Sequence, residues 1–343
     1  MNVNRRGFLA GAAAFSAACT SIPGLAASRS GRVSFCAFAD IHHFPGYWPH
    51  SGREWLDRIL SRADSEKTDF TIQLGDMVHD VVRERDYLKA YGSFRQPTYH
   101  VVGNHDGERN RRSDMLDAFG LEKPHYMFER NGFRFIVFDP NFFLTKDGRH
   151  VAYEGYNLSQ ALKANVVEKG CIIPPDQVEW LRDAVEGSSL PCVLFSHESI
   201  ERDHSASNAR AVRAILNDVN RRNPGRVRLV VNGHHHIDYV RVEKDIVYLD
   251  LNSATYQYFV KPHDLYPAEY VKKNLNSRHS IAWNDPLSAI ITLDAAGSIE
   301  IKGSHSTCMF GITPEKAGYS PYDPLGRAAV PYIRSFRFEK KFS

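Results

Sequence analysis

Short apolar runs alternate with longer amphipathic stretches along the first two thirds of the chain. The run Val33-Ser34-Phe35-Cys36-Ala37-Phe38 predicts a buried strand, and the spacing of Trp55, Ile59 and Ala63 places one apolar face on a helix at 54–63. The same two patterns recur along the chain. They predict strands at 70–74, 98–102, 125–129, 133–138, 192–195 and 227–231, and helices at 83–94, 114–119, 176–185 and 208–222.

The last third of the chain favours strands, with further runs at 237–243, 246–252, 287–294 and 298–302. Asn131-Gly132 separates two strand runs and predicts a hairpin turn. Segments 139–173 and 256–285 follow neither periodicity, and we expect them to form loops over a site. The order of elements predicts an α/β fold, in which two packed mixed β-sheets are flanked by helices in four layers.

No internal repeat or linker divides the chain after its first 28 residues. We therefore expect one catalytic domain at 29–305, with residues 306–343 as a C-terminal extension that packs on it.

The first 28 residues are typical of a signal peptide, with Arg5 and Arg6 ahead of an apolar stretch at 8–18 and a region of small residues. The paired arginines before Gly7-Phe8-Leu9 resemble the twin-arginine export type. The apolar stretch is shorter than the roughly 20 residues that span a bilayer, so no membrane span is expected after processing. We expect a periplasmic or secreted protein that uses the twin-arginine export machinery. A lipid anchor at Cys19 and an N-terminal helix of the domain are the alternatives.

The net charge and the cysteine content bear on nucleic-acid binding and on disulfide bonds. Cleavage would lower the net charge from +3 to +1, because residues 1–28 contain two arginines and no acidic residue. A nearly neutral protein gives no reason to expect nucleic-acid binding. Cys36, Cys171, Cys192 and Cys308 would remain and allow three disulfide pairings. Cys36 and Cys192 lie within apolar runs, which predicts buried free thiols.

Polar residues that can bind a metal follow five of the predicted strands. The strand ends are Asp40-Ile41-His42, Gly75-Asp76, Gly103-Asn104-His105-Asp106, Ser196-His197 and Gly233-His234-His235-His236. In an open α/β sheet, ligand sites lie at the carboxyl ends of the strands, so these residues can converge on one place. Residues two apart in an extended segment point the same way, which pairs Asp40 with His42 and His234 with His236.

The combined set contains seven nitrogen and oxygen ligands, which is more than one ion takes and indicates two ions. Imidazole together with carboxylate suits Mn, Fe or Zn better than Ca. The candidate ligands are Asp40, His42, Asp76, Asn104, His197, His234 and His236.

The order of these motifs resembles the calcineurin-like metallophosphoesterase family, whose pattern is D-x-H, G-D-x-x-D, G-N-H-D/E, an isolated H, and G-H-x-H. The resemblance implies one metal at Asp40, His42 and His236, a second at Asn104, His197 and His234, and Asp76 as the bridge between them. It also implies His105 as the acid that protonates the leaving group and Asp106 as the partner of His105. His79 departs from the pattern, because the family has Asp there, or Tyr in purple acid phosphatases. His79 is either a hydrogen-bond partner of a metal ligand or a loop residue.

The resemblance and the ligand chemistry together predict a hydrolase of small phosphate esters. Two metal ions would acidify a bridging water, and the resulting hydroxide would attack phosphorus. A cyclic-nucleotide or nucleotide-diphosphate hydrolase is one alternative, and a non-catalytic metal-binding protein is another. We expect the irregular stretch 43–53 to wall the pocket together with segments 139–173 and 256–285. Aromatic residues of these three segments could stack on a nucleobase, although such residues often only pack a loop; they are Tyr47, Trp48, Phe142, Phe143, Tyr153, Tyr156, Tyr256 and Tyr258.

Overall fold

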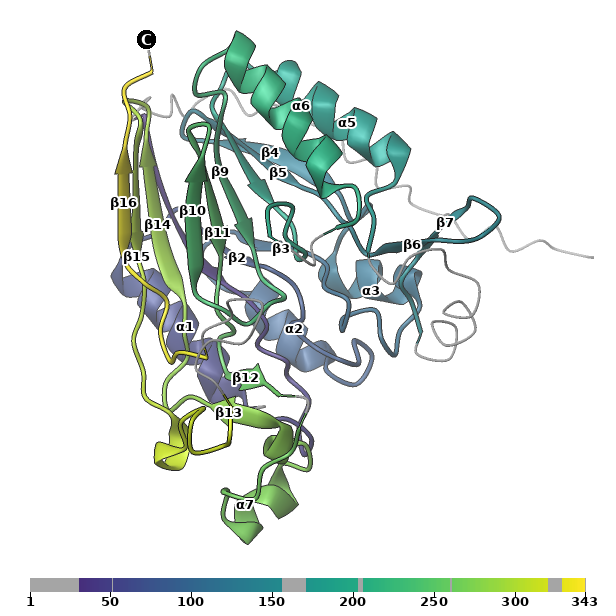
Figure 1. Cartoon of the computed structure of the whole chain (residues 1–343), viewed down its shortest axis with the longest axis vertical. Coiled ribbons are helices and arrows are strands. Elements are labelled where there is room, and N and C mark those ends of the chain that lie inside the picture. The colour runs from purple at the N-terminus through teal and green to yellow at the C-terminus, as the bar shows by residue number, and fades with distance from the viewer. Residues whose placement is uncertain are drawn as a thin grey trace, which may run out of the picture.

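Two six-stranded sheets pack face to face in the computed structural model of the chain (Figure 1). The structure describes residues 31–50, 52–155, 171–202, 206–259, 261–319 and 329–342. The predicted signal peptide, Cys19 and Tyr156 lie outside these ranges. None of the described helices is long and apolar enough to cross a membrane.

The first sheet has the strand order β16-β15-β14-β1-β2-β3, and β1, β2 and β3 run parallel to one another. Antiparallel strands extend it beyond β1. The strand bounds are β1 Arg32–Phe38, β2 Phe70–Gln73, β3 Thr98–His100, β14 Ala289–Asp294, β15 Ser298–Lys302 and β16 Phe336–Glu339. Because β1, β2 and β3 are parallel, their carboxyl ends meet at one edge of the sheet.

The second sheet has the order β10-β11-β9-β8-β5-β4, with a parallel centre and an antiparallel strand at each edge. Its bounds are β4 Tyr126–Arg130, β5 Phe133–Val137, β8 Cys192–Phe195, β9 Val227–Asn232, β10 Tyr239–Glu243 and β11 Ile246–Asp250. The turn between β4 and β5 takes positive φ at Asn131 (50°) and Gly132 (84°), which confirms the predicted hairpin.

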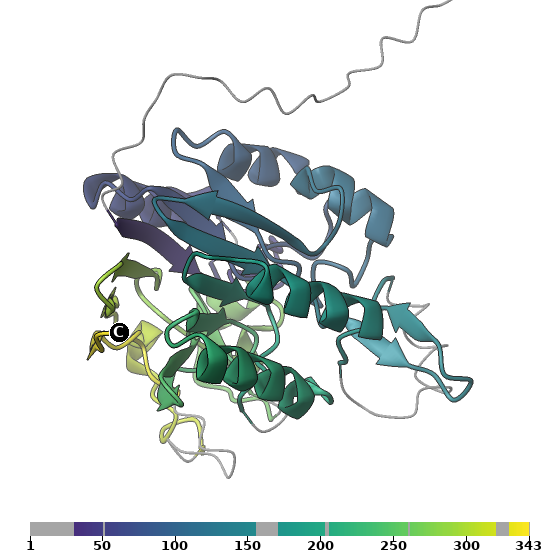
Figure 2. The same cartoon turned by 90° about the horizontal axis from the view of Figure 1, so that it is seen from above.

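Side chains along the central strands point alternately to the two faces of each sheet, and this explains the four layers. In β1, Val33, Phe35 and Ala37 face the other sheet, while Cys36 and Phe38 face the helices α1 (Arg53–Ser65), α2 (Arg85–Gly92) and α3 (Arg112–Phe119). The helices α5 (Pro175–Glu186) and α6 (Ala209–Arg222) cover the outer face of the second sheet. Figure 2 shows the layers in this order, and the predicted fold class is confirmed.

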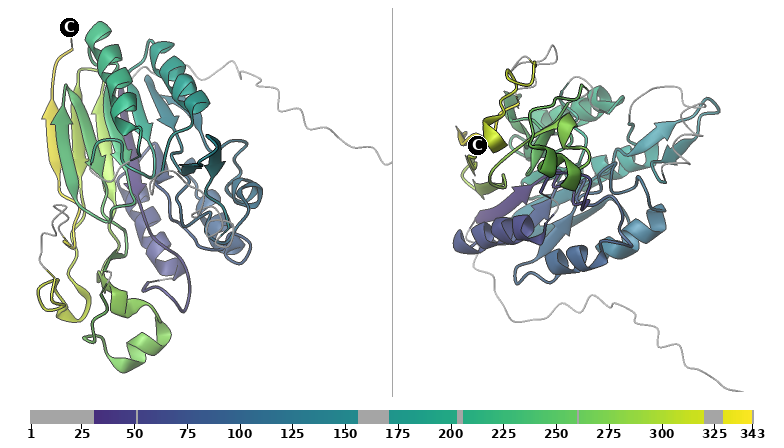
Figure 3. Two further views of the ribbon diagram at one scale, coloured as in Figure 1. Left: turned by 45° about the vertical axis from the view of Figure 1, so that its right-hand side comes forward. Right: turned by 90° about the horizontal axis from the view of Figure 1, so that it is seen from below.

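The two segments that were predicted to be loops contain short regular elements. A small hairpin of β6 (Phe142–Leu144) and β7 (His150–Ala152) follows β5. Between 256 and 285 lie β12 (Tyr256–Tyr258), α7 (Ala268–Lys273), the 3-10 turn η1 (Ser277–His279) and β13 (Ser280–Ala282). Figure 3 shows α7 projecting beyond the ends of both sheets. These elements are too short for periodicity in the sequence to predict them.

The C-terminal part of the chain contributes an edge strand that the apolar pattern did not predict. β16 pairs with β15, and Phe336 and Phe338 pack against the core between the sheets. Among the described residues all four cysteines are free, and Cys36 and Cys192 are fully buried as predicted.

Candidate metal centre

The carboxyl ends of strands from both sheets converge on one site, where all seven predicted ligands lie close together. Backbone hydrogen bonds tie the loops after β1 and β2 to each other, since the Asp40 N–H donates to the Gly75 carbonyl and the His42 N–H to that of Asp76. The loops therefore hold the ligands by their backbones as well as by their side chains.

The first group of ligands is Asp40, His42 and His236, whose donor atoms all lie within 4.8 Å of one another. The two Nε2 atoms of His42 and His236 are 3.0 Å apart, and Oδ1 of Asp40 lies 3.4 Å from His236 Nε2. Asp40 is fully buried, and its Oδ2 accepts the His234 N–H. No described residue gives Oδ1 a hydrogen bond. A buried carboxylate oxygen without a donor, facing two imidazole nitrogens, fits a bound cation.

The second group is Asp76, His197 and His234, joined by Asn104. Asn104 Oδ1 lies 3.1 Å from both His197 Nε2 and His234 Nδ1. Asp76 Oδ1 accepts the backbone N–H of His105, so Oδ2 is left between the two groups, 3.1 Å from His197 Nε2 and 3.8 Å from His42 Nε2. The grouping is the one that the resemblance implies, with Asp76 between the two sets.

Hydrogen bonds on the far side of each ring leave one nitrogen facing the centre. His197 Nδ1 donates to the Leu74 carbonyl at 2.7 Å, and His236 Nδ1 donates to the Tyr256 carbonyl at 2.8 Å. A neutral imidazole that donates through Nδ1 keeps its lone pair on Nε2, which is the form that binds a metal.

Glu198 contacts the far side of the His234 ring, and His234 faces the centre through Nδ1 rather than Nε2. The Nε2 atom of His234 lies 3.0 Å from Glu198 Oε2, and Glu198 is buried. Burial raises the pKa of Glu198 to about 7. Sequence reasoning missed this residue; its place directly after His197 was the available signal.

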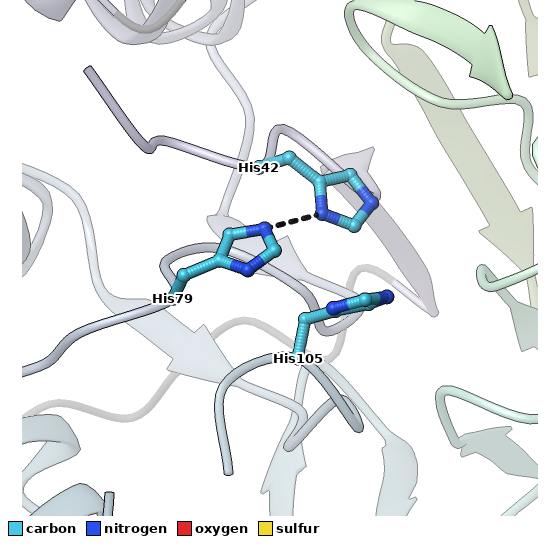
Figure 4. A group of neighbouring side chains, drawn as sticks. All are labelled: His42, His79 and His105. Carbon is cyan, nitrogen blue, oxygen red and sulfur yellow. Dashed lines mark hydrogen bonds between the residues drawn. The ribbon is translucent and has the colours of Figure 1, made fainter. Parts of the chain in front are cut away.

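Three histidines, His42, His79 and His105, lie beside one another at the edge of the centre. Figure 4 shows their side chains pointing toward one another, with a hydrogen bond between His42 and His79. His42 Nδ1 is 3.1 Å from His79 Nε2, and His79 Nδ1 is 2.9 Å from Glu108 Oε2. Burial lowers the pKa of His79, so a neutral His79 donates a hydrogen bond from Nδ1 to Glu108 and accepts one at Nε2 from His42 Nδ1–H. His79 is therefore a hydrogen-bond partner of a predicted ligand, and the alternative of a plain loop residue is wrong.

The predicted pairing of Asp106 with His105 is wrong. Both oxygens of the buried Asp106 accept backbone N–H groups instead, from Asp76 and Gly103 at Oδ2 and from Met77 and Val78 at Oδ1. Asp106 thus shapes the loops that carry the ligands. The side chain turns inward because four amides of two tight turns need an acceptor where water is excluded.

Glu108 is the carboxylate that pairs with His105, and sequence reasoning missed it. Its Oε2 accepts from His105 Nδ1 at 2.9 Å and also from His79. Burial raises the pKa of Glu108, but hydrogen bonds from both rings outweigh that and hold it well below its usual range. The signal was a carboxylate three residues after His105.

Five predicted ligands have left-handed backbone, which non-glycine residues rarely adopt: Asp40 (φ 53°), His42 (48°), Asp76 (53°), His234 (68°) and His236 (52°). Such a conformation costs on the order of 1–3 kcal/mol per residue and is concentrated at functional sites. Close approach adds a requirement for glycine, because a Cβ at Gly103 would lie 2.2 Å from Asp76 Oδ1. The local structure holds these side chains at the centre at a cost in stability.

A pocket of about 490 Å³ opens over the centre. Its lining includes an aromatic wall of Phe44, Tyr47, Trp48, Tyr256 and Tyr258, whose rings contact one another, and the charged residues Glu108 and Arg109. Of the aromatic residues predicted to wall the site, Phe142, Phe143 and Tyr153 are not among the lining residues. They lie at and beside the β6–β7 hairpin.

The chain is similar to several proteins of known structure, and the first of those named here shares its fold. A dimetal phosphatase from Danio rerio aligns over 81% of this chain and 98% of its own, with 16% identity and a TM-score of 0.53. GAP50, the anchor in the inner membrane complex of Plasmodium, aligns over 79% and 84%, with 14% identity and a TM-score of 0.48. PhoD aligns over 90% and 70%, with 13% identity and a TM-score of 0.48. No curated protein matches the sequence significantly.

The family model described as calcineurin-like phosphoesterase matches residues 33–238, a range that contains every predicted ligand from Asp40 to His236. The match covers more than half of the chain and includes strands of both sheets. The chain is therefore a metallophosphoesterase that belongs to the calcineurin-like phosphoesterase family.

Proposed function

We propose that this protein hydrolyses small phosphate esters with two metal ions, Mn, Fe or Zn, held by the seven predicted ligands. The observation that carries the proposal is the convergence of imidazole, carboxylate and amide donors around the unsatisfied Asp40 Oδ1. When bound, the ions would supply the positive charge that stabilises phosphoryl oxygens and acidifies water. Asp40, His42 and His236 would hold one ion, Asn104, His197 and His234 the other, and Asp76 both.

His105 is proposed as the acid that protonates the leaving oxygen. Its side chain is about one-third exposed (35%) and lines the pocket, and Nδ1 is engaged by Glu108, so Nε2 is the nitrogen free to serve the substrate. Burial lowers the pKa of His105, but the charge of Asp76 and the bond to Glu108 raise it to about 9. Bound cations would lower this value towards neutrality, where a general acid works best.

A nucleotide substrate is the second candidate, and the aromatic wall favours it. Trp48 stacks on Tyr256 with ring centroids 4.8 Å apart, and Tyr47 and Tyr258 remain partly exposed at the rim. Exposed phenol rings beside a phosphate site could hold the ring of a cyclic nucleotide or a nucleotide diphosphate.

The test measures metal content and hydrolysis on the mature protein loaded with Mn²⁺ or Zn²⁺. Mono-aryl phosphate, bis-aryl phosphate, a cyclic nucleotide and a nucleoside diphosphate ester would separate the substrate classes. His42→Asn should lose metal and activity. His43→Asn is the matched control, because the neighbouring His43 bonds to Glu84 and stacks on Tyr87 outside the centre.

Hydrolysis of none of these esters by protein with both ions bound would contradict the proposal. That result would favour the alternative of a non-catalytic metal-binding protein. Equal metal loss in His42→Asn and His43→Asn would contradict the assignment of His42.

We also propose that the protein is exported by the twin-arginine route to the periplasm or beyond. The support is the sequence of residues 1–28, with Arg5 and Arg6 ahead of the apolar stretch. Replacing both arginines by lysine should keep the protein in the cytoplasm, as cell fractionation would show. Undiminished export of that variant would remove the twin-arginine assignment, and acylation of Cys19 would establish the lipid anchor.

A further inference from the structure

Arg109 lies at the mouth of the metal pocket and has no part in the chemistry described so far. Its side chain is exposed and lines the pocket, and its guanidinium carbon lies 4.7 Å from the centre of the Phe44 ring. No hydrogen bond or ion pair among the described residues holds its nitrogen atoms. A guanidinium that rests on an aromatic face keeps its donors free for a ligand and gives up little freedom when it binds one.

The position of Phe44 links Arg109 to the centre. The Phe44 ring stacks on His79 at 5.1 Å and 18°, and His79 bonds to the predicted ligand His42. Phe44 also contacts Tyr47 at 5.2 Å, so the surface beneath Arg109 continues into the aromatic wall. Arg109 therefore lines the same pocket as the predicted ligands and rests on the Phe44 ring of the aromatic wall.

Arg109 lines the same pocket as His105, the residue proposed to protonate the leaving group. Arg109 follows Glu108 in the chain, and Glu108 holds His105. A substrate that presents its leaving oxygen to His105 would bring its leaving group into the pocket that Glu108 and Arg109 also line. This step rests on the proposed function, because it takes the role of His105 from it.

We propose that Arg109 binds an oxyanion carried by the leaving group, so that the substrates are phosphate esters or anhydrides with a second anionic group. The scissile phosphate would be neutralised at the metal centre, and this second charge would have no partner there. A guanidinium pairs with a carboxylate or phosphate through two parallel hydrogen bonds, which gives both affinity and orientation. The chemistry is shared by carboxylates and phosphates, and the experiment separates the two.

Arg83 provides a matched control within the chain. Its guanidinium also lies over Phe44, at 6.0 Å, but its Nε pairs with Glu84 Oε1 at 3.2 Å and it does not line the pocket. Loss of Arg83 removes the same charge from the same neighbourhood. The comparison therefore separates specific binding at Arg109 from a general effect of positive charge.

The experiment compares kcat/KM for 4-carboxyphenyl phosphate and 4-carbamoylphenyl phosphate, whose leaving groups have nearly the same shape but differ in charge. The metal-loaded wild-type protein should prefer the carboxylate by about tenfold or more, the range of a hydrogen bond to a charged group. In Arg109→Gln the preference should fall to about one. Arg109→Lys should restore part of it, and Arg83→Gln should keep it. A third substrate with a phosphonate in place of the carboxylate shows which oxyanion is preferred.

Three results would overturn the inference while leaving the proposed function intact, and the first two concern the wild-type protein and Arg109→Gln. One is hydrolysis of both esters by the wild-type protein with no preference, and the other is an undiminished preference in Arg109→Gln. An equal loss of preference in Arg83→Gln would also overturn it, because the effect would then be general electrostatics. Failure of metal-loaded protein to hydrolyse either ester would overturn the proposed function and this inference together.

Discussion

Replacing Glu108 with glutamine should slow the reaction of poor leaving groups while leaving both metal ions in place. Glutamine keeps the size of the side chain but removes the charge that His105 Nδ1 and His79 Nδ1 both contact at 2.9 Å. A hydrogen bond to a charged group contributes about 1.5–3 kcal/mol, which converts to roughly 10- to 150-fold in rate if it acts only through His105. This range reaches only the lower end of the 10²–10⁴-fold that a general acid contributes, as expected for a residue that acts through the acid.

The assay compares an alkyl phosphate with a nitrophenyl phosphate in four proteins: wild type, Glu108→Gln, His105→Ala and the double variant. The alkoxide needs a proton to leave, whereas nitrophenolate hardly does. Both single variants should therefore lose far more rate on the alkyl ester, with unchanged metal content. Because Glu108 acts through His105, adding Glu108→Gln to His105→Ala should cost almost nothing further.

Additive losses in the double variant would refute this reasoning. They would mean that Glu108 affects the rate independently of His105. The effect would then pass through the hydrogen bond of Glu108 to His79, which in turn bonds to the predicted ligand His42. Loss of metal in Glu108→Gln would point to the same route. Equal losses on both leaving groups would show that His105 does not donate a proton.

Three further outcomes follow from particular contacts. Asp76→Asn should lower the content of both metals more than any other ligand change, because Oδ2 lies between the two groups, and near-full occupancy would contradict the bridge. Asp106→Asn should lower the free energy of unfolding by about 2–5 kcal/mol in urea denaturation, since the new amide would leave buried N–H groups unpaired, and unchanged stability would contradict that. Burial lowers the pKa of His100 to about 3, so the unfolded chain takes up a proton below its ordinary value of about 6.5 and the folded chain does not. Stability is therefore lost as the pH falls, and His100→Gln should reduce the loss between pH 7 and pH 5 by about 2 kcal/mol in urea denaturation with chelator; an unchanged loss would contradict this.

The sequence by itself determined the layers of the fold and the place of the site. Buried strands such as 33–38 and amphipathic helices such as 54–63 are long enough for their periodicity to identify them. Parallel strands bring their carboxyl ends to one edge whatever the loops do. The polar residues at the ends of β1, β2 and β3 therefore share one edge, as do those at the ends of β8 and β9, and the packing of the two sheets joins the two groups into one set of ligands from Asp40 to His236.

Only the tertiary structure decided which side chains support those ligands. Asp106 and Glu108 both follow His105 closely, and either could have been its partner. Asp106 is not the partner of His105 because its carboxylate accepts hydrogen bonds from four buried backbone amides, which leaves Glu108 to pair with His105. Likewise, β16 became a strand by pairing with β15. Such contacts join residues far apart in the chain or inside irregular loops, where the direction of a side chain is set by packing and hydrogen bonding rather than by a repeating pattern.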